Sequence, residues 1–148
     1  MKKIHALILV TSCIICFLSV NAFSHCEIPC GIYDDEMRIE MINEHIGTVE
    51  KSMNQIMEIE KGDHQNSNQL VRWIMNKEDH ANEIQEIVSQ YFMTQRIKPD
   101  AKDYDKKLGL LHEMLIYAMK CKQTTDLSHT EKMKDLVKEF QGLYFEVK

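Results

Sequence analysis

The sequence predicts an all-α protein, an antiparallel, up-down four-helix bundle preceded by a short N-terminal hook. Apolar residues recur at helical spacing in four segments, and short polar stretches separate these segments. Four helices with short connections favour a bundle in which consecutive helices run in opposite directions. A separate observation predicts the hook, namely a dense group of sulfur and nitrogen donors within residues 25–33.

The first 24 residues have the three parts of an export signal. Lys2 and Lys3 form a positive start, residues 4–20 are almost wholly apolar, and Ala22-Phe23-Ser24 has the small-x-small pattern that a signal peptidase accepts. We therefore expect cleavage after Ser24 and no stable association with a membrane afterwards. The expected division of the chain is a signal peptide over 1–24, the hook over 25–36 and the four-helix bundle over 37–148.

Two alternatives stay open for the N-terminal segment. An apolar run of this length is near the lower limit for spanning a bilayer, so an uncleaved membrane anchor is one alternative. Lipoprotein processing at Cys13 is the other, because Val10-Thr11-Ser12-Cys13 has lipobox-like residues, although the apolar sequence continues past it. Either alternative would leave His25 inside the chain and without a free amine.

Removal of residues 1–24 takes away two lysines and no acidic residue, so the formal net charge changes from −5 to −7. An acidic chain disfavours nucleic acid as a partner, since nucleic-acid binding requires a basic surface. Net charge also gives an anionic substrate no attraction, so any steering must come from a local basic patch. Arg96 and Lys98 could form such a patch, although charges before Pro99 are more often a solvated helix end.

The first helical pattern covers residues 37–60 approximately, and Asp34, Asp35 and Glu36 stand near its positive end. Its apolar stripe consists of Ile39, Ile42, Ile46, Val49, Met53 and Ile56. Residues 62–67 then predict a polar connection. A second helix is expected from about Asn68 to Gln95, with an apolar face made of Leu70, Ile74, Ala81, Ile84, Val88 and Tyr91.

Pro99 and Asp100 predict the next turn, because proline ends a helix and restricts the residue before it. The third stripe consists of Tyr104, Leu108, Leu111, Leu115 and Ala118. Ser128-His129-Thr130-Glu131 then has the form of a capping box, in which the serine and the glutamate satisfy backbone donors at a helix start. The fourth helix carries Met133, Leu136, Val137, Phe140 and Tyr144.

Residues 25–33 read His-Cys-Glu-Ile-Pro-Cys-Gly-Ile-Tyr and bring several metal donors together. At a free terminus, the amine of His25 and the amide nitrogen of Cys26 can form a chelate that the sulfurs of Cys26 and Cys30 complete in a plane. Two nitrogens and two thiolates in a plane suit nickel(II) or copper(II), whereas zinc prefers a tetrahedron. The imidazole of His25 stays available as an axial ligand, and Pro29 and Gly31 help the chain to fold back.

This arrangement resembles the nickel superoxide dismutases, whose mature chains begin His-Cys-x-x-Pro-Cys-Gly-x-Tyr. The resemblance implies a nickel-binding hook over residues 25–36, a four-helix bundle and a homohexameric assembly, with one nickel ion in each subunit. It implies the disproportionation of superoxide to dioxygen and hydrogen peroxide by a Ni(II)/Ni(III) ping-pong cycle. The signal predicts an exported protein, periplasmic or extracellular, with a cytoplasmic protein after processing as the alternative.

The resemblance also assigns roles to single residues. His25, Cys26 and Cys30 match the nickel ligands, and Tyr33 matches the tyrosine that guards the approach of substrate. Two further matches are Glu40, for the acidic residue that hydrogen-bonds the axial imidazole, and Tyr91, for the second tyrosine near the first.

The sequence departs from the family's pattern in two places. Familiar members have a proline after Tyr-Asp and one more residue before Arg-Ile-Glu, so the register of Glu40 differs. They also have an arginine in a Lys-Glu-x-Arg-Ala stretch, where this chain has Lys77-Glu78-Asp79-His80-Ala81. His80 could take the arginine's role more weakly, because imidazole is not always charged near neutrality.

Other interpretations of these residues remain. Cys26 and Cys30 could form a disulfide in an exported protein, which would leave Cys121 as a small buried residue. The hook could serve an exported nickel or copper carrier without turnover, although a carrier needs no tyrosine over an open axial position. The remaining histidines show no metal-ligand spacing and are expected at the surface or in the core: His45, His64, His112 and His129.

Overall fold

The computed structural model describes residues 31–62 and 66–145. Within these ranges every regular element is helical: α2 (Asp35–Lys61), α3 (Ser67–Glu86), the π-helical segment η1 (Ile87–Arg96), α4 (Tyr104–Gln123) and α5 (Ser128–Phe145). No strand occurs there, and none of these helices is long and apolar enough to cross a membrane. The predicted signal peptide and the predicted nickel ligands His25, Cys26 and Cys30 lie outside the described residues.

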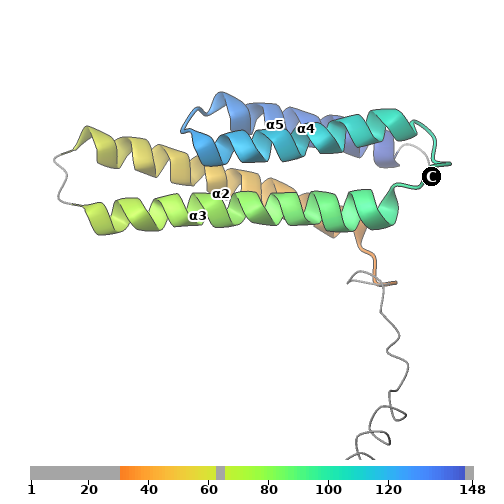
Figure 1. The fold of residues 1–148 in the computed structure, drawn as a ribbon, viewed down its shortest axis with the longest axis horizontal. Coiled ribbons are helices and arrows are strands. Elements are labelled where there is room, and N and C mark those ends of the chain that lie inside the picture. The colour runs from red at the N-terminus through yellow and green to blue at the C-terminus, as the bar shows by residue number, and fades with distance from the viewer. Residues whose placement is uncertain (1–30, 63–65, 146–148) are drawn as a thin grey trace, which may run out of the picture.

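The helices form a bundle of four rods, because η1 continues α3 without a break (Figure 1). α2 packs against α3 and α4 against α5, while α3–α4 and α2–α5 contacts close the bundle. The chain reverses direction at each connection (Figure 1). The α2–α3 pair is also longer than the α4–α5 pair and extends beyond it at the end where α2 stops and α3 starts.

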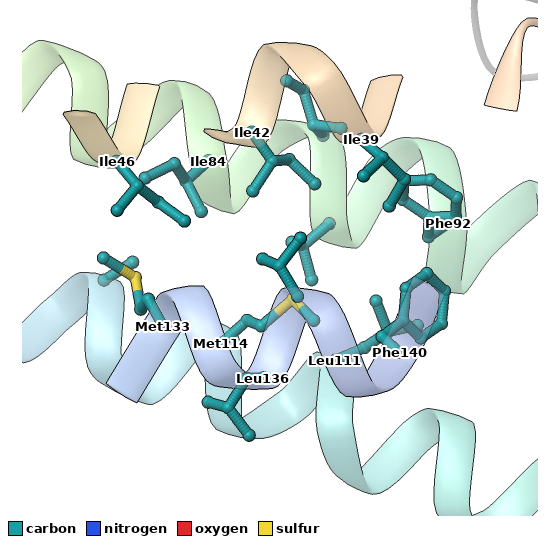
Figure 2. Close-up of a cluster of buried hydrophobic side chains, with 14 of the residues drawn as sticks. Ile39, Ile42, Ile46, Ile84, Phe92, Leu111, Met114, Met133, Leu136 and Phe140 are labelled. Carbon is teal, nitrogen blue, oxygen red and sulfur yellow. The ribbon is translucent and has the colours of Figure 1, made fainter. Parts of the chain in front are cut away.

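α2 follows the sequence prediction closely. Asp34 caps it, since its carboxylate accepts a hydrogen bond of 3.0 Å from the backbone N–H of Met37. The whole predicted stripe of α2 is buried. Figure 2 shows Ile39, Ile42 and Ile46 turned toward the side chains of α4 and α5. Burying each of these side chains stabilises the fold by about 1.5–3 kcal/mol.

Opposite α2, the core contains a T-shaped contact between Phe92 of η1 and Phe140 of α5, whose ring centroids are 5.2 Å apart. Met114, Met133 and Leu136 continue the core from this contact along α4 and α5 (Figure 2). The core therefore extends to the end of the bundle where η1 meets the last turns of α5.

The predicted stripe of α3 is only partly buried. Ala81, Ile84 and Val88 are inside the core, whereas Ile74 is 40% exposed and Leu70 is half-buried. The reason is the unequal length of the helix pairs, because the first turns of α3 lie on the part of the α2–α3 pair that α4 and α5 do not cover. Lys77 is buried instead, and its ammonium group donates to the carbonyl oxygens of Lys122 (2.5 Å) and Thr124 (3.4 Å).

Two details of the second half differ from prediction. The fully buried face of α4 is rotated from the predicted stripe, of which Leu111 and Ala118 are buried and the other members half-buried; it consists of Lys107, Leu110, Leu111, Met114, Ala118 and Cys121. The predicted capping box is wrong, because the N–H of Glu131 donates to the Leu127 carbonyl. Asp126 satisfies the start of α5 instead, its carboxylate accepting from the N–H of Ser128 at 3.0 Å.

Candidate functional site

Tyr33 lies just before α2 and marks the end of the bundle to which the predicted hook is attached. Its ring stands edge-on to that of Tyr91, with centroids 6.0 Å apart. Tyr91 is almost fully buried at 3% exposed, whereas Tyr33 is 44% exposed. Gly31, directly after Cys30 in sequence, has a φ of 74°, in the left-handed region that glycine adopts without strain. The structure therefore brings the two predicted tyrosines together beside a sharp turn.

The carboxylate of Asp35 in the first turn of α2 accepts four hydrogen bonds. Its Oδ1 accepts from the Tyr91 hydroxyl (2.7 Å) and Arg96 Nε (2.8 Å). Its Oδ2 accepts from Arg96 Nη2 (2.8 Å) and the Tyr144 hydroxyl (2.9 Å). We call these four residues the Asp35 cluster, which ties α2 to η1 and α5 with every lone-pair direction of the carboxylate used.

π-helical winding lets two residues of η1 reach the same carboxylate. Tyr91 and Arg96 are five positions apart, and in an α-helix such residues point about 140° away from each other. In η1 the N–H of Ile97 donates to the carbonyl of Phe92, five residues earlier, at 2.9 Å. This spacing puts residues five apart nearly above one another, so both side chains point at Asp35.

Hydrogen bonding fixes the charge states of the Asp35 cluster. Burial raises the pKa of Asp35, but hydrogen bonds from Arg96, Tyr91 and Tyr144 outweigh it and lower the pKa below the usual value. Burial, together with the hydrogen bond and charge of Asp35, raises the pKa of Tyr91 to about 12 and that of Tyr144 to about 12. Both phenols therefore keep their protons near neutral pH, and Asp35 keeps its charge.

Two arginines flank the tyrosine pair. The guanidinium carbon of Arg96 lies 4.3 Å from the centroid of the Tyr33 ring, and that of Arg38 lies 5.0 Å from the centroid of the Tyr91 ring. Both are within cation–π range. Arg96 is also paired with Asp35, whereas Arg38 makes no ion pair within the described part of the chain, and its Nε is buried without a hydrogen-bond partner there.

Tyr33 also borders an open hollow of about 410 Å³ at this end of the bundle. The hollow is lined by Tyr33, Asp34, Asp35, Glu36, Arg96 and Phe145. A second open groove, of about 610 Å³, shares Glu36 and Phe145 with it and continues along α2 and α5 past Glu40 and Lys138. Glu40 is exposed in this groove, so its carboxylate is accessible from the side of Tyr33.

The structure does not bring Glu40 and His80 together. His80 lies on the α3 side of α2, where its Nδ1 is 2.8 Å from Nδ1 of His45. One ring donates a proton to the other, and Nε2 of His45 is buried without a partner in the described residues. Burial first, and then the charge of His80, lower the pKa of His45.

Sequence reasoning missed several residues of this end of the bundle. Asp35 was interpreted only as a favourable charge at a helix start, and Arg96 as a free cation. Tyr144 was assigned to the core and His45 to no site. Sequence periodicity gave no signal for these contacts, because α-helical spacing would place Tyr91 and Arg96 on different sides of the helix.

A metal site within the bundle finds no support. Across residues 31–62 and 66–145, no group of three or more histidine, cysteine, aspartate or glutamate side chains is arranged to hold a metal ion. Cys121 is fully buried, and burial raises the pKa of its thiol to about 12, which disfavours the thiolate form that binds metals.

Comparison with protein-family models gives one match, to the family described as nickel-containing superoxide dismutase, over residues 20–148. No curated protein and no solved structure matches the chain.

Proposed function

The chain belongs to the nickel-containing superoxide dismutases, and we propose that its nickel ion is held by residues 25–30, next to Tyr33. The protein is a nickel-dependent oxidoreductase that converts superoxide to dioxygen and hydrogen peroxide. When bound, nickel supplies a redox couple that accepts an electron from one superoxide ion and returns it to another. The single observation that carries the proposed location is the donor set of His25, Cys26 and Cys30 directly before the Tyr33–Tyr91 pair.

The donors fit the ion by their chemistry. The thiolates of Cys26 and Cys30, the terminal amine of His25 and the backbone amide of Cys26 would hold the ion, because a nickel(II)/nickel(III) couple requires strong electron donors. The His25 imidazole would be a further ligand. Cys121, the cysteine that the bundle contains between residues 31 and 145, is buried in a protonated state and is unsuited to this task.

The described residues act on substrate access and on protons. The half-exposed ring of Tyr33 lines the open hollow at this end of the bundle, and Tyr91 supports that ring from the core side. Because the pKa of Tyr91 is raised to about 12, its phenol stays protonated and holds Asp35. We expect this pair to admit small anions and to keep larger molecules from the metal.

The predicted role of Glu40 is kept as a proposal, whereas that of His80 is not. The exposed carboxylate of Glu40 in a groove continuous with the Tyr33 hollow supports a hydrogen bond to the His25 imidazole, which would set the orientation of that ligand. The contact of His80 with His45 points to a different task, because it uses one ring nitrogen of His80 and lies on the other side of α2.

The wider organisation of the protein is also proposed. Residues 1–24 are a cleaved signal, the nickel hook precedes an antiparallel four-helix bundle, and subunits assemble as a homo-oligomer, a hexamer by family resemblance. Export to the periplasm or the exterior would place the enzyme where it meets superoxide produced outside the cytoplasm. Activity confined to cytosolic fractions would contradict export.

The first experiment is intact-mass analysis of the protein from its native host under non-denaturing conditions. We expect a chain that starts at His25 and carries one nickel ion. Three variants then locate the ion: Cys26→Ser and Cys30→Ser, which each lose a thiolate, and a glycine inserted before His25, which removes the chelating amine but leaves both thiolates. All three should lose bound nickel and nearly all superoxide turnover.

Cys121→Ser is the matched control, since it changes a cysteine outside the proposed site and should retain nickel. A processed chain whose Cys26 and Cys30 are joined in a disulfide without metal would overturn the proposed site. Nickel binding without turnover would favour a metal carrier.

A further inference from the structure

The Asp35 cluster connects Tyr33 and Tyr91, which have roles in the proposed function, with Asp35 and Arg96, which have none there. Tyr91 donates directly to Asp35, whereas Tyr33 is linked to Asp35 indirectly, through the guanidinium of Arg96 and through its ring contact with Tyr91. One carboxylate thereby reaches both tyrosines of the pair. The side chain of Asp35 is only 9% exposed, so its orientation is set by these contacts and not by solvent.

Arg96 is held in one plane by its two bonds to Asp35. Nε and Nη2 each donate at 2.8 Å to a different oxygen of the carboxylate, the bidentate arrangement that fixes a guanidinium most firmly. This fixed group lies 4.3 Å from the ring centroid of Tyr33. A lysine would keep the charge, but it would lose the second donor and the flat surface that faces the ring.

Within residues 31–62 and 66–145, Tyr33 has few other restraints. It precedes the first residue of α2, and nearly half of its surface is exposed. Besides Arg96, the aromatic contact that holds its ring is with Tyr91, at 6.0 Å. Tyr91 is in turn fixed by its hydrogen bond to Asp35. Both restraints on the Tyr33 ring therefore depend on Asp35, one through Arg96 and one through Tyr91.

We propose that Asp35 and Arg96 are positioning residues for superoxide turnover, which hold the ring of Tyr33 over the approach to residues 25–30. The inference rests on the proposed function of Tyr33 as the residue at the substrate entrance. The π-helical winding of η1 contributes to this positioning, since it directs Tyr91 and Arg96 to the same carboxylate. Arg96 thus acts by its shape and fixed orientation, and its charge is already neutralised by Asp35.

The test uses the nickel-loaded enzyme and a double-mutant cycle. Tyr33→Ala, Arg96→Lys and the double variant are compared with the parent protein for kcat, KM and nickel content. We expect Arg96→Lys to change KM in the same direction as Tyr33→Ala, by about two- to fivefold, which corresponds to the loss of one cation–π contact. Arg96→Lys should have no further effect when Tyr33 is already alanine, because it acts through that ring.

Arg72→Lys provides the matched control, since it makes the same exchange on an exposed position of α3 and should leave both constants unchanged. Equal effects of Arg96→Lys in the presence and absence of the Tyr33 ring would overturn the inference and indicate a purely structural ion pair. If Tyr33→Ala leaves kcat and KM unchanged, the proposed role of Tyr33 fails, and the positioning role falls with it. An effect of Tyr33→Ala without any effect of Arg96→Lys rejects the positioning role alone.

Discussion

Two of the polar contacts between α2 and the rod formed by α3 and η1 differ in how completely their groups are hydrogen-bonded. At one end, the carboxylate of Asp35 accepts four hydrogen bonds. Further along α2, His45 meets His80 through one shared proton, and Nε2 of His45 is buried without a partner among the described residues. We call the first the closed contact, because its carboxylate has a donor for each acceptor position. We call the second the open contact, because one ring nitrogen of His45 has no partner among the described residues.

The two contacts also differ in how their protonation depends on pH. The pKa of Asp35 is lowered and those of Tyr91 and Tyr144 are raised to about 12, so the Asp35 cluster keeps its charges across the neutral range. The pKa of His45 is lowered from a value that already lies close to neutrality. A fixed cluster therefore lies beside the hollow that Tyr33 lines, and His45, whose pKa is lowered, lies further along α2.

The largest effect is expected from opening the closed contact. Asp35→Ala leaves the partly buried guanidinium of Arg96, the buried phenol of Tyr91 and the half-buried phenol of Tyr144 without their acceptor, so the free energy of unfolding should fall by about 3 kcal/mol. Tyr144→Phe removes a single hydrogen bond to the same carboxylate and should cost about 1 kcal/mol. Urea unfolding followed by circular dichroism measures both losses.

Asp135→Ala is the control for these stability measurements, because Asp135 is exposed on α5. A loss in Asp35→Ala no larger than in this control would mean that the cluster contributes nothing to stability, and the contrast between the two contacts would disappear.

The two contacts also show what sequence can predict. The stripe of α2 was predicted correctly residue by residue, since helical periodicity alone determines which side of a straight helix is apolar. The family resemblance, confirmed over residues 20–148, rested on fixed positions within residues 25–33. Patterns within one segment were therefore enough for the helices, for the family and for its chemistry.

Contacts between segments were the part that sequence could not supply. Asp35 and Tyr144 are 109 positions apart, and no local pattern pairs them. The meeting of His45 and His80 depends on the register of α2 against α3, and the reach of Arg96 depends on π-helical winding. The exposure of Ile74 was also missed, because the apolar pattern of α3 does not show that α4 and α5 are too short to cover its first turns.

An intermediate effect is expected from the open contact. The unfolded chain binds a proton at His45 near the ordinary pKa of 6.5, whereas the folded pKa is lower. Between these two values the unfolded state carries more protons, so stability is complete above pH 6.5 and falls as the pH decreases below it. Glu44 and Glu83 oppose this trend by raising the pKa, while burial and the charge of His80 lower it further.

His45→Gln tests this dependence. The variant should lose about 1 kcal/mol at pH 8, where it sacrifices one hydrogen bond, and its disadvantage should shrink as the pH falls toward 5. His112→Gln, at an exposed position, should leave the pH profile unchanged. Thermal unfolding from pH 8 to 5 checks both, and a constant difference between parent and His45→Gln would show that the pKa of His45 does not change on unfolding.

The smallest effect concerns the two arginines beside the tyrosines. Arg96 and Lys98 were considered as a local basic patch or, more commonly, a solvated helix end, but the pairing of Arg96 with Asp35 cancels most of its charge. Arg38 has no ion pair in the described part of the chain, so it is the better candidate for a local positive field near Tyr91. Arg38→Gln should therefore reduce kcat/KM about two- to threefold at low ionic strength, because a nearby cation steers a small anion.

Salt separates this effect from a structural one. At high ionic strength, where the Debye length falls to about 3 Å at 1 M, kcat/KM of Arg38→Gln should approach that of the parent enzyme. Arg96→Lys should leave the slope of kcat/KM against ionic strength unchanged, since the Asp35–Arg96 pair has little net charge to screen. Lys98→Gln gives the exposed reference. If Arg38→Gln keeps its deficit at every salt concentration, Arg38 acts by packing against Tyr91, and both arginines serve the tyrosine pair by contact alone.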